Sequence, residues 1–166
     1  MYRKMIVVTA ATLMVGIWAA EAATGGGGGT TPVRCLDTAW RRSEVSTSST
    51  TFVDVPGFTD SPSSIFPIAI DVSAVVSGAP VEFRVLSTNV GDQTVASKPG
   101  RAVFVPTGGH PDAFSFQWIE RNQSAAVHVI DLRLQWRSPS GADAHLLRGD
   151  MAVLYDTTPG ACAASA

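Results

Sequence analysis

The chain has 166 residues and contains 12 lysines and arginines against 14 aspartates and glutamates, for a net charge of −2. That length suits one domain with a single core. Because the few basic residues are scattered, the composition excludes a phosphate-binding patch for nucleic acid and a polybasic contact with a membrane surface.

Residues 1–22 have the three parts of a secretory signal peptide. Arg3 and Lys4 form a basic start, residues 5–20 are an uncharged apolar run, and small residues precede a cleavage point after Ala22. The apolar run is shorter than the roughly twenty residues that a membrane-spanning helix needs, which favours cleavage over an uncleaved anchor. We therefore expect an exported mature chain, extracellular or periplasmic, with no membrane contact after cleavage.

Residues 23–34 form a glycine-rich leader. Consecutive glycines at 25–29 have no side chains to bury and the largest backbone entropy to lose, which is typical of a flexible segment. A phosphate-binding loop would need a preceding strand, a following helix and usually a Lys-Ser/Thr pair, and this segment has none of these sequence signals. Residues 35–162 remain as the folded domain.

The two cysteines lie near the two ends of the mature chain. Cys35 and Cys162 allow a single intramolecular pairing, and an exported protein enters a compartment in which disulfides form. Two free thiols are the alternative. A Cys35–Cys162 disulfide would place the first and last strands of the domain side by side.

Hydrophobicity with a period of two residues dominates the domain. Residues 66–76 and 129–137 alternate apolar with mostly polar side chains, whereas a helix would group Asp131 and Arg133 with the apolar ones. Both segments are therefore predicted strands. Shorter alternating segments occur at 53–55, 81–85, 101–105, 114–118 and 151–155, and the polar residues 46–51 fit an edge strand or a loop.

Turn residues separate these segments, and predicted turns include residues 98–100 and 148–150. Many short strands without helical patterns between them predict an all-β domain, an antiparallel β-sandwich or jelly roll of seven to nine strands. The expected core aromatics are Phe66, Phe83, Phe114, Phe116, Trp118 and Trp136.

Three of these segments, 78–85, 129–137 and 151–155, carry a family resemblance. They are similar to secreted bacterial β-sandwich proteins related to the C1q/TNF-type jelly roll, in which a long penultimate strand ends in a tryptophan and a last strand closes the sheet. The likeness covers about residues 51–156. It implies an exported domain, open to assembly as a homo-oligomer such as a trimer, with no catalytic residues to carry over. The sequence departs from the animal members because no collagen-like Gly-X-Y stalk precedes the domain.

Candidate binding residues are few. His110 and Asp112 follow two glycines on a predicted exposed loop, and His145 follows a second turn. No histidine has a second His or Cys at zinc-ligand spacing, so the sequence predicts no metal and indicates no cofactor. Trp40 precedes two arginines, and burial near Cys35 is the favoured interpretation, with exposure toward a ligand as the alternative.

Two short motifs are common by chance and carry little weight alone. Arg148-Gly149-Asp150 is the tripeptide that integrins read, and Gly149 is equally explained by a turn. Asn122-Gln123-Ser124 fits an N-glycosylation sequon.

These observations favour a secreted, non-catalytic binding or structural module that contacts a glycan, a protein surface or another subunit. The alternative is an extracellular hydrolase with an acid/base site on its loops. No nucleophile-elbow Gly-x-Ser-x-Gly motif supports a serine hydrolase. The two classes differ in whether titratable groups converge on a pocket.

Overall fold

The computed structural model describes residues 31–64, 67–91, 93, 95–120, 128–160 and 162. Within these ranges the chain forms ten strands and no helix. Eight strands have between 8 and 14 residues, which agrees with the expected seven to nine, and β2 and β4 are much shorter. The strands are β1 (Val33–Arg41), β2 (Val45–Thr47), β3 (Val53–Asp60), β4 (Ser63–Ser64), β5 (Ile68–Gly78), β6 (Val81–Asn89), β7 (Val95–Val105), β8 (Asp112–Glu120), β9 (His128–Arg137) and β10 (Ala144–Thr157).

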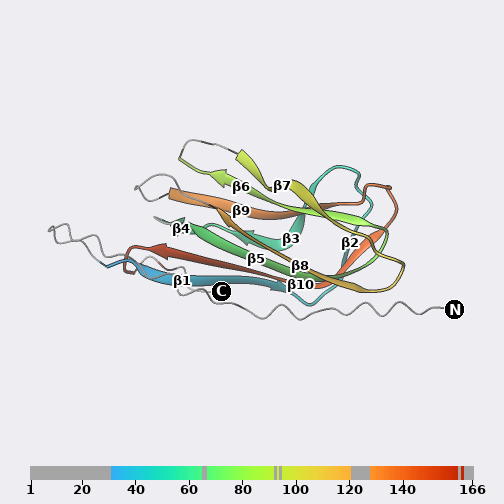
Figure 1. Cartoon of the computed structure of the whole chain (residues 1–166), viewed down its shortest axis with the longest axis horizontal. Coiled ribbons are helices and arrows are strands. Elements are labelled where there is room, and N and C mark those ends of the chain that lie inside the picture. The colour runs from blue at the N-terminus through green and yellow to red at the C-terminus, as the bar shows by residue number, and fades with distance from the viewer. Residues whose placement is uncertain are drawn as a thin grey trace, which may run out of the picture.

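The strands form two antiparallel sheets that lie face to face (Figure 1). The first sheet has the order β1-β10-β5-β8, and β2 pairs with the other end of β10. The second sheet has the order β3-β9-β6-β7, and β4 pairs with β9.

The strand pairs are nested along the chain. β6 pairs with β7, β5 with β8, β3 with β9 and β1 with β10, so the whole domain is one long antiparallel ribbon wrapped into two layers. Eight long strands in two sheets with this connectivity define a double-sheet jelly roll. The predicted all-β sandwich is confirmed.

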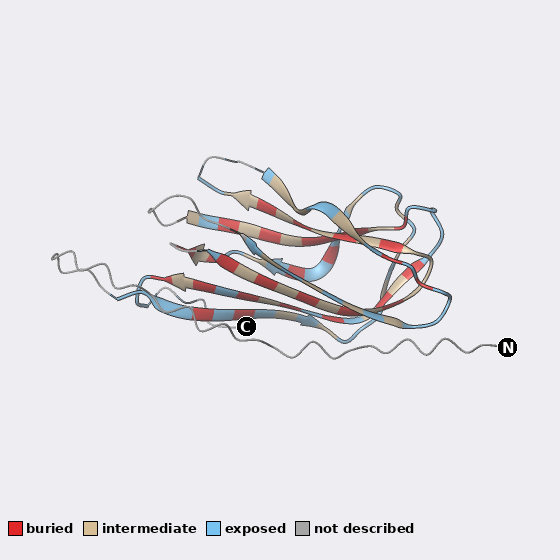
Figure 2. Cartoon of the chain, in the orientation of Figure 1, coloured by how far each residue is buried: buried red, intermediate tan, exposed pale blue. Residues whose placement is uncertain are grey.

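Alternation along each strand builds the core, as the banded colouring of Figure 2 shows. In β5, Ile68, Ile70 and Val72 are buried while the residues between them are only partly so. In β9, every second residue from Ile130 to Trp136 is buried, as the sequence predicts. One face of each sheet therefore points inward.

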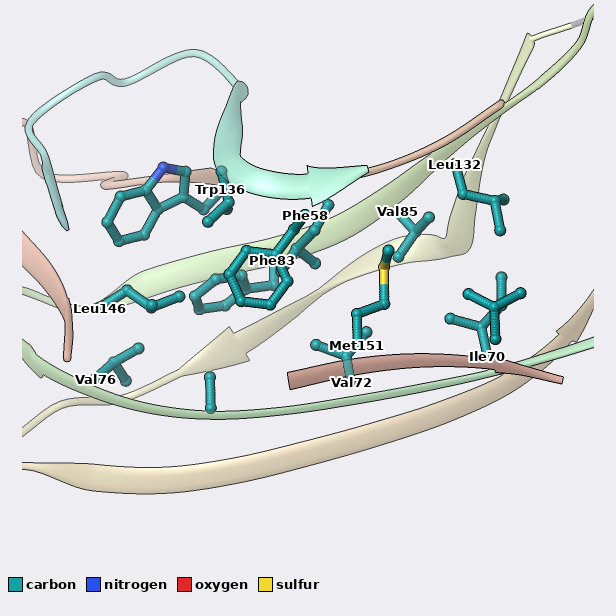
Figure 3. Packing of buried hydrophobic residues seen from close by; sticks show 14 of the residues in the cluster. Phe58, Ile70, Val72, Val76, Phe83, Val85, Leu132, Trp136, Leu146 and Met151 are labelled. Atoms are coloured by element: carbon teal, nitrogen blue, oxygen red, sulfur yellow. The ribbon is translucent and has the colours of Figure 1, made fainter. Parts of the chain in front are cut away.

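Large side chains from both sheets meet at the centre of the core (Figure 3). Phe58, Phe83 and Trp136 of the second sheet pack opposite Met151 of the first, and all four are fully buried. The aromatic residues of β8 are only half-buried because β8 is an edge strand, although the Phe114 ring centroid lies 4.6 Å from that of Phe83. Phe66 lies outside the described residues.

The predicted disulfide joins Cys35 and Cys162 across 127 residues of sequence. As expected from that bond, the first and last strands pair over the full length of β1. β1 begins at Val33, so two residues that the sequence assigned to the leader belong to the sheet, where Arg34 forms an ion pair of 2.9 Å with Asp156.

Three of the turns that the sequence predicts are strand residues instead. Residues 148–150 lie inside β10, just after a bulge that leaves Leu147 without a partner in β5. Residues 98–100 lie inside β7, where the register with β6 shifts. Residues 56–57 lie inside β3, where the register with β9 shifts. In each place an irregularity in the ladder absorbs the turn-forming residues without ending the strand. The signal peptide, the sequon and most of the leader lie outside the described residues.

Candidate functional site

The loop between β7 and β8 holds the first predicted binding residues. His110 is exposed there, and Asp112 begins β8. The loop is fastened at its start, because Thr107 Oγ1 donates a hydrogen bond of 2.6 Å to the carbonyl oxygen of Gly78. The Asp112 carboxylate accepts a long hydrogen bond of 3.4 Å from the Gly108 backbone N–H. These contacts describe an ordered turn, and they leave the imidazole of His110 facing solvent.

The sheet register separates His145 from that loop. Asp112 lies opposite Val76 and His145 lies opposite Ser77, on the two sides of β5. Because neighbouring residues of a strand point to opposite faces, the Asp112 side chain belongs to the core face and the His145 side chain to the outer face. His145 Nδ1 lies 2.8 Å from Glu44 Oε1, an ion-pair distance without the alignment of a hydrogen bond. The described structure therefore does not bring these two predicted residues together.

Trp40 is exposed, with 60% of its surface accessible. The expectation that it is buried near Cys35 is wrong, and the reason is parity: Cys35 points inward, so a residue five positions later in the same strand points outward. The guanidinium of Arg42 lies 5.2 Å from the centroid of the Trp40 ring. Extending the period-two rule to β1 would have placed this tryptophan correctly.

Trp40 belongs to the outer face of the first sheet, by which we mean the side of β1, β10, β5 and β8 that points away from the core. The register of the four strands aligns one row of apolar residues across this face. Each residue of the row pairs with the next one on the neighbouring strand, in the order Leu36, Leu154, Ala69 and Ile119. Leu36 and Ile119 are each 56% exposed. The next row holds Thr38, Ala152, Asp71 and Gln117, and the row after it holds Trp40, Asp150, Ser73 and Ser115.

The outer face of the second sheet carries more paired charges. Arg84 Nε donates a hydrogen bond of 2.9 Å to Gln135, and Gln135 Nε2 donates one of 2.6 Å to Asp54. Arg137 forms an ion pair of 2.7 Å with Glu82. Charged pairs thus occupy the middle of this face, although Val95, Phe104 and Val129 are also exposed on it. The first sheet differs in aligning its exposed apolar side chains in one row across four strands, and a contiguous exposed apolar patch is typical of an interaction surface.

Two carboxylates lie near each other between β1 and β3. Asp37 is buried and accepts a hydrogen bond of 2.8 Å from the hydroxyl of Tyr155. Burial, and to a lesser extent the charge of Asp37, raises the pKa of Asp60 to about 6. The Asp60 carboxylate also accepts a hydrogen bond of 2.8 Å from the Ser61 backbone N–H, and this bond lowers the pKa in part. One oxygen of Asp60 is buried without a hydrogen-bond partner. Sequence patterning gave no sign of this pair, because its members come from different sheets.

Within the described ranges, no group of three or more His, Cys, Asp or Glu side chains could hold a metal ion. In the same ranges no helix is long and apolar enough to cross a membrane.

The strand order defines a jelly-roll domain with an exposed apolar row on the outer face of its first sheet. No protein-family model matches the chain, and no curated protein matches it. Solved structures of infectious bursal disease virus do resemble it. The structure of the Gt strain of this virus matches with a TM-score of 0.55 and 17% sequence identity over 79% of the chain described here. The structure of the VP2 subviral particle matches with a TM-score of 0.52 and 18% sequence identity over 80% of the chain.

The chain spans about a third of the length of those viral chains, 35% in both cases. At this level of identity the likeness concerns the fold. These viral structures support a β-sandwich resemblance, and they do not support the C1q/TNF-type or bacterial kinship that the strand motifs suggested.

Proposed function

We propose that the mature chain is an exported, non-catalytic structural module that works by binding further copies of itself. The observation that carries the proposal is the apolar row across the outer face of the first sheet, from Leu36 to Ile119. An exposed row of apolar side chains costs solubility unless a partner covers it.

The solved structures with this fold favour self-association over other contacts. The viral structures that the chain resembles include a viral particle and a subviral particle. A jelly roll is thus a fold that can serve as a building unit, and we carry that role over as a proposal.

Export is the second part of the proposal. The Cys35–Cys162 disulfide supports it, because such bonds persist in oxidising compartments and are rare in the cytosol. The signal-like residues 1–22 support it independently. Mass spectrometry of the exported chain tests this part, since we expect an N-terminus at Ala23.

Sedimentation equilibrium of residues 23–166 tests self-association. We expect the apparent mass to rise from monomer toward dimer as the protein concentration increases. A monomeric mass at every concentration up to about 1 mM, the weak limit of specific association, would contradict the proposal.

A glycan contact through Trp40 is the second candidate. The exposed indole favours it, because sugar rings stack on flat aromatic side chains. Co-sedimentation with insoluble chitin, cellulose and peptidoglycan tests it: retention that is lost in Trp40→Ala supports the glycan role, and no retention of the unmodified chain rejects it.

The hydrolase alternative receives no support from the predicted loop residues. Asp112 and His145 belong to opposite faces of the first sheet, which does not favour an acid/base pair formed by these two residues. The Asp37–Asp60 pair lies between the sheets, and Asp37 is buried there.

A further inference from the structure

We infer that two copies of the chain pack their outer faces together about a two-fold axis that runs parallel to the strands, between β10 and β5. This inference rests on the proposed function and adds the surface, the symmetry and the residues that meet. Two sheets that pack face to face keep their strands within about 30° of each other, which this axis allows.

The axis makes the apolar row complementary to itself. Because the sheet order is β1-β10-β5-β8, the rotation places β1 over β8 and β10 over β5 of the second copy. Leu36 then faces Ile119 of the second copy, and Leu154 faces Ala69. Each large side chain of the inner strands meets a small one, as close packing between two surfaces requires.

The neighbouring row with Trp40 follows the same rule. Trp40, Asp150, Ser73 and Ser115 lie opposite one another in that order across the sheet. The rotation sets the Trp40 indole over Ser115 of the second copy, a position with room for it. An exposed tryptophan that enters a space lined by small residues is typical of the residues that dominate binding energy.

The two aspartates in these rows of the outer face meet no like charge in this arrangement. Asp71 is paired with Gln117 by a hydrogen bond and would face Ala152 of the second copy. Asp150 would face Ser73 in the same way. No carboxylate of these rows meets a carboxylate, so the two-fold avoids the repulsion that the charged face of the second sheet would create.

The size of the face places the expected interface in a size class. Four strands about 4.8 Å apart and nine residues long at about 3.3 Å each give ~550 Å² per copy. Two copies would bury about 1,100 Å², which passes the ~1,000 Å² of a biological interface and falls short of the ~1,600 Å² of a standard one. We therefore expect a reversible, concentration-dependent dimer.

Cross-linking between two single-cysteine variants tests the geometry. In the inferred dimer Thr38 faces Gln117 of the second copy. The native cysteines are bonded to each other, so a maleimide reagent reacts only with the introduced thiols. Opposed sheets lie about 10 Å apart, a gap that a short bismaleimide spans. We expect a mixture of Thr38→Cys and Gln117→Cys chains to form cross-linked dimers, and a mixture of Thr38→Cys with Arg133→Cys, on the other sheet, to form almost none.

A charge placed in the apolar row tests the surface without risking the core. Ile119→Arg should weaken self-association at least tenfold, since the arginine would face Leu36 of the second copy. Phe104→Arg is the matched control, because Phe104 is 54% exposed on the second sheet, and it should leave association unchanged.

The outcomes separate the two proposals. A chain that stays monomeric at all concentrations overturns both. If the Ile119→Arg variant associates as well as the unmodified chain, and the Thr38→Cys and Gln117→Cys chains form no cross-link, the proposed self-association stands and this interface is overturned. Loss of association in Ile119→Arg alone, together with the specific cross-link, supports both.

Discussion

The Phe58 ring of β3 packs onto the bare backbone of Gly149 in β10, where a Cβ atom would lie 3.2 Å from Phe58 Cζ. The same Cβ would lie 3.2 Å from the Ala74 Cβ and from the carbonyl oxygen of Ser73. An added Cβ atom at Gly149 would therefore be crowded by both sheets, so this glycine favours their close contact. This explains the glycine of the Arg-Gly-Asp tripeptide without an adhesive role, because the tripeptide lies within a strand rather than on a loop.

Gly149→Ala should lower the free energy of unfolding by about 1–3 kcal/mol, the cost of overpacking a closed core. Urea denaturation measures the change. Gly108→Ala is the control, since a Cβ there meets no atom within 4 Å, and its effect should stay within about 0.5 kcal/mol. Equal stabilities of the two variants would show that the sheets do not meet closely at Phe58.

The two core tryptophans should differ in their contributions. Trp136 is 1% exposed and stacks at 6.0 Å from Phe83, whereas Trp118 is only partly buried on the edge strand β8. Trp136→Ala should cost about 3–5 kcal/mol and Trp118→Ala roughly half of that. Denaturation curves of both variants check the order, and a larger loss in Trp118→Ala would contradict the core described above.

The disulfide should contribute strongly because it closes almost the whole domain. A double variant Cys35→Ser and Cys162→Ser should be less stable by about 4–5 kcal/mol in the chain-entropy model for a loop of over a hundred residues. Mass spectrometry after alkylation first establishes the bond. Two labelled thiols without a reductant would refute it, whereas labelling only after reduction supports it.

Asp60 should make stability fall as the pH rises from about 4 to about 6. Its pKa is raised to about 6 in the folded chain from an ordinary value of 3.8, so between these values the folded state holds a proton that the unfolded state has lost. Folding is then favoured at the acidic end of this window and loses that advantage by its upper end.

Asp60→Asn removes this cost, because an amide does not ionise. At pH 7 the variant should be more stable by about 1 kcal/mol, a figure reduced from the full shift because the side chain is only half-buried. The difference between variant and unmodified chain should shrink below pH 4. Asp143→Asn, an exposed carboxylate, is the control. If the stability difference between Asp60→Asn and the unmodified chain does not change with pH, the Asp60 carboxyl does not have a raised pKa.

Local sequence patterning was sufficient for the fold class and most of the core. Alternation in 129–137 placed Leu132, Leu134 and Trp136 correctly, because a half-buried strand has an inescapable period of two. The disulfide followed from cysteine count and position. Turn prediction failed at residues 148–150, because Gly149 packs against Phe58, which is distant in sequence, and does not form a local turn.

The candidate surface could not be predicted in the same way. Leu36, Ala69, Ile119 and Leu154 come from four strands, and only the strand order and register align them. Single exposed apolar residues are ordinary, so none of the four is a signal by itself. The loop residues His110 and Asp112 attracted attention because of their chemistry, while the more continuous feature lies on a sheet face.

Acrylamide quenching of Trp40 fluorescence across a dilution series tests the central claim most directly, with Trp40→Phe measured at low concentration, where both chains are monomers, to subtract the signal of the other tryptophans. If copies meet through the outer face of the first sheet, Trp40 is readily quenched at low concentration, and it becomes protected in the range where sedimentation detects the dimer. Protection that never develops while the dimer forms would contradict the account.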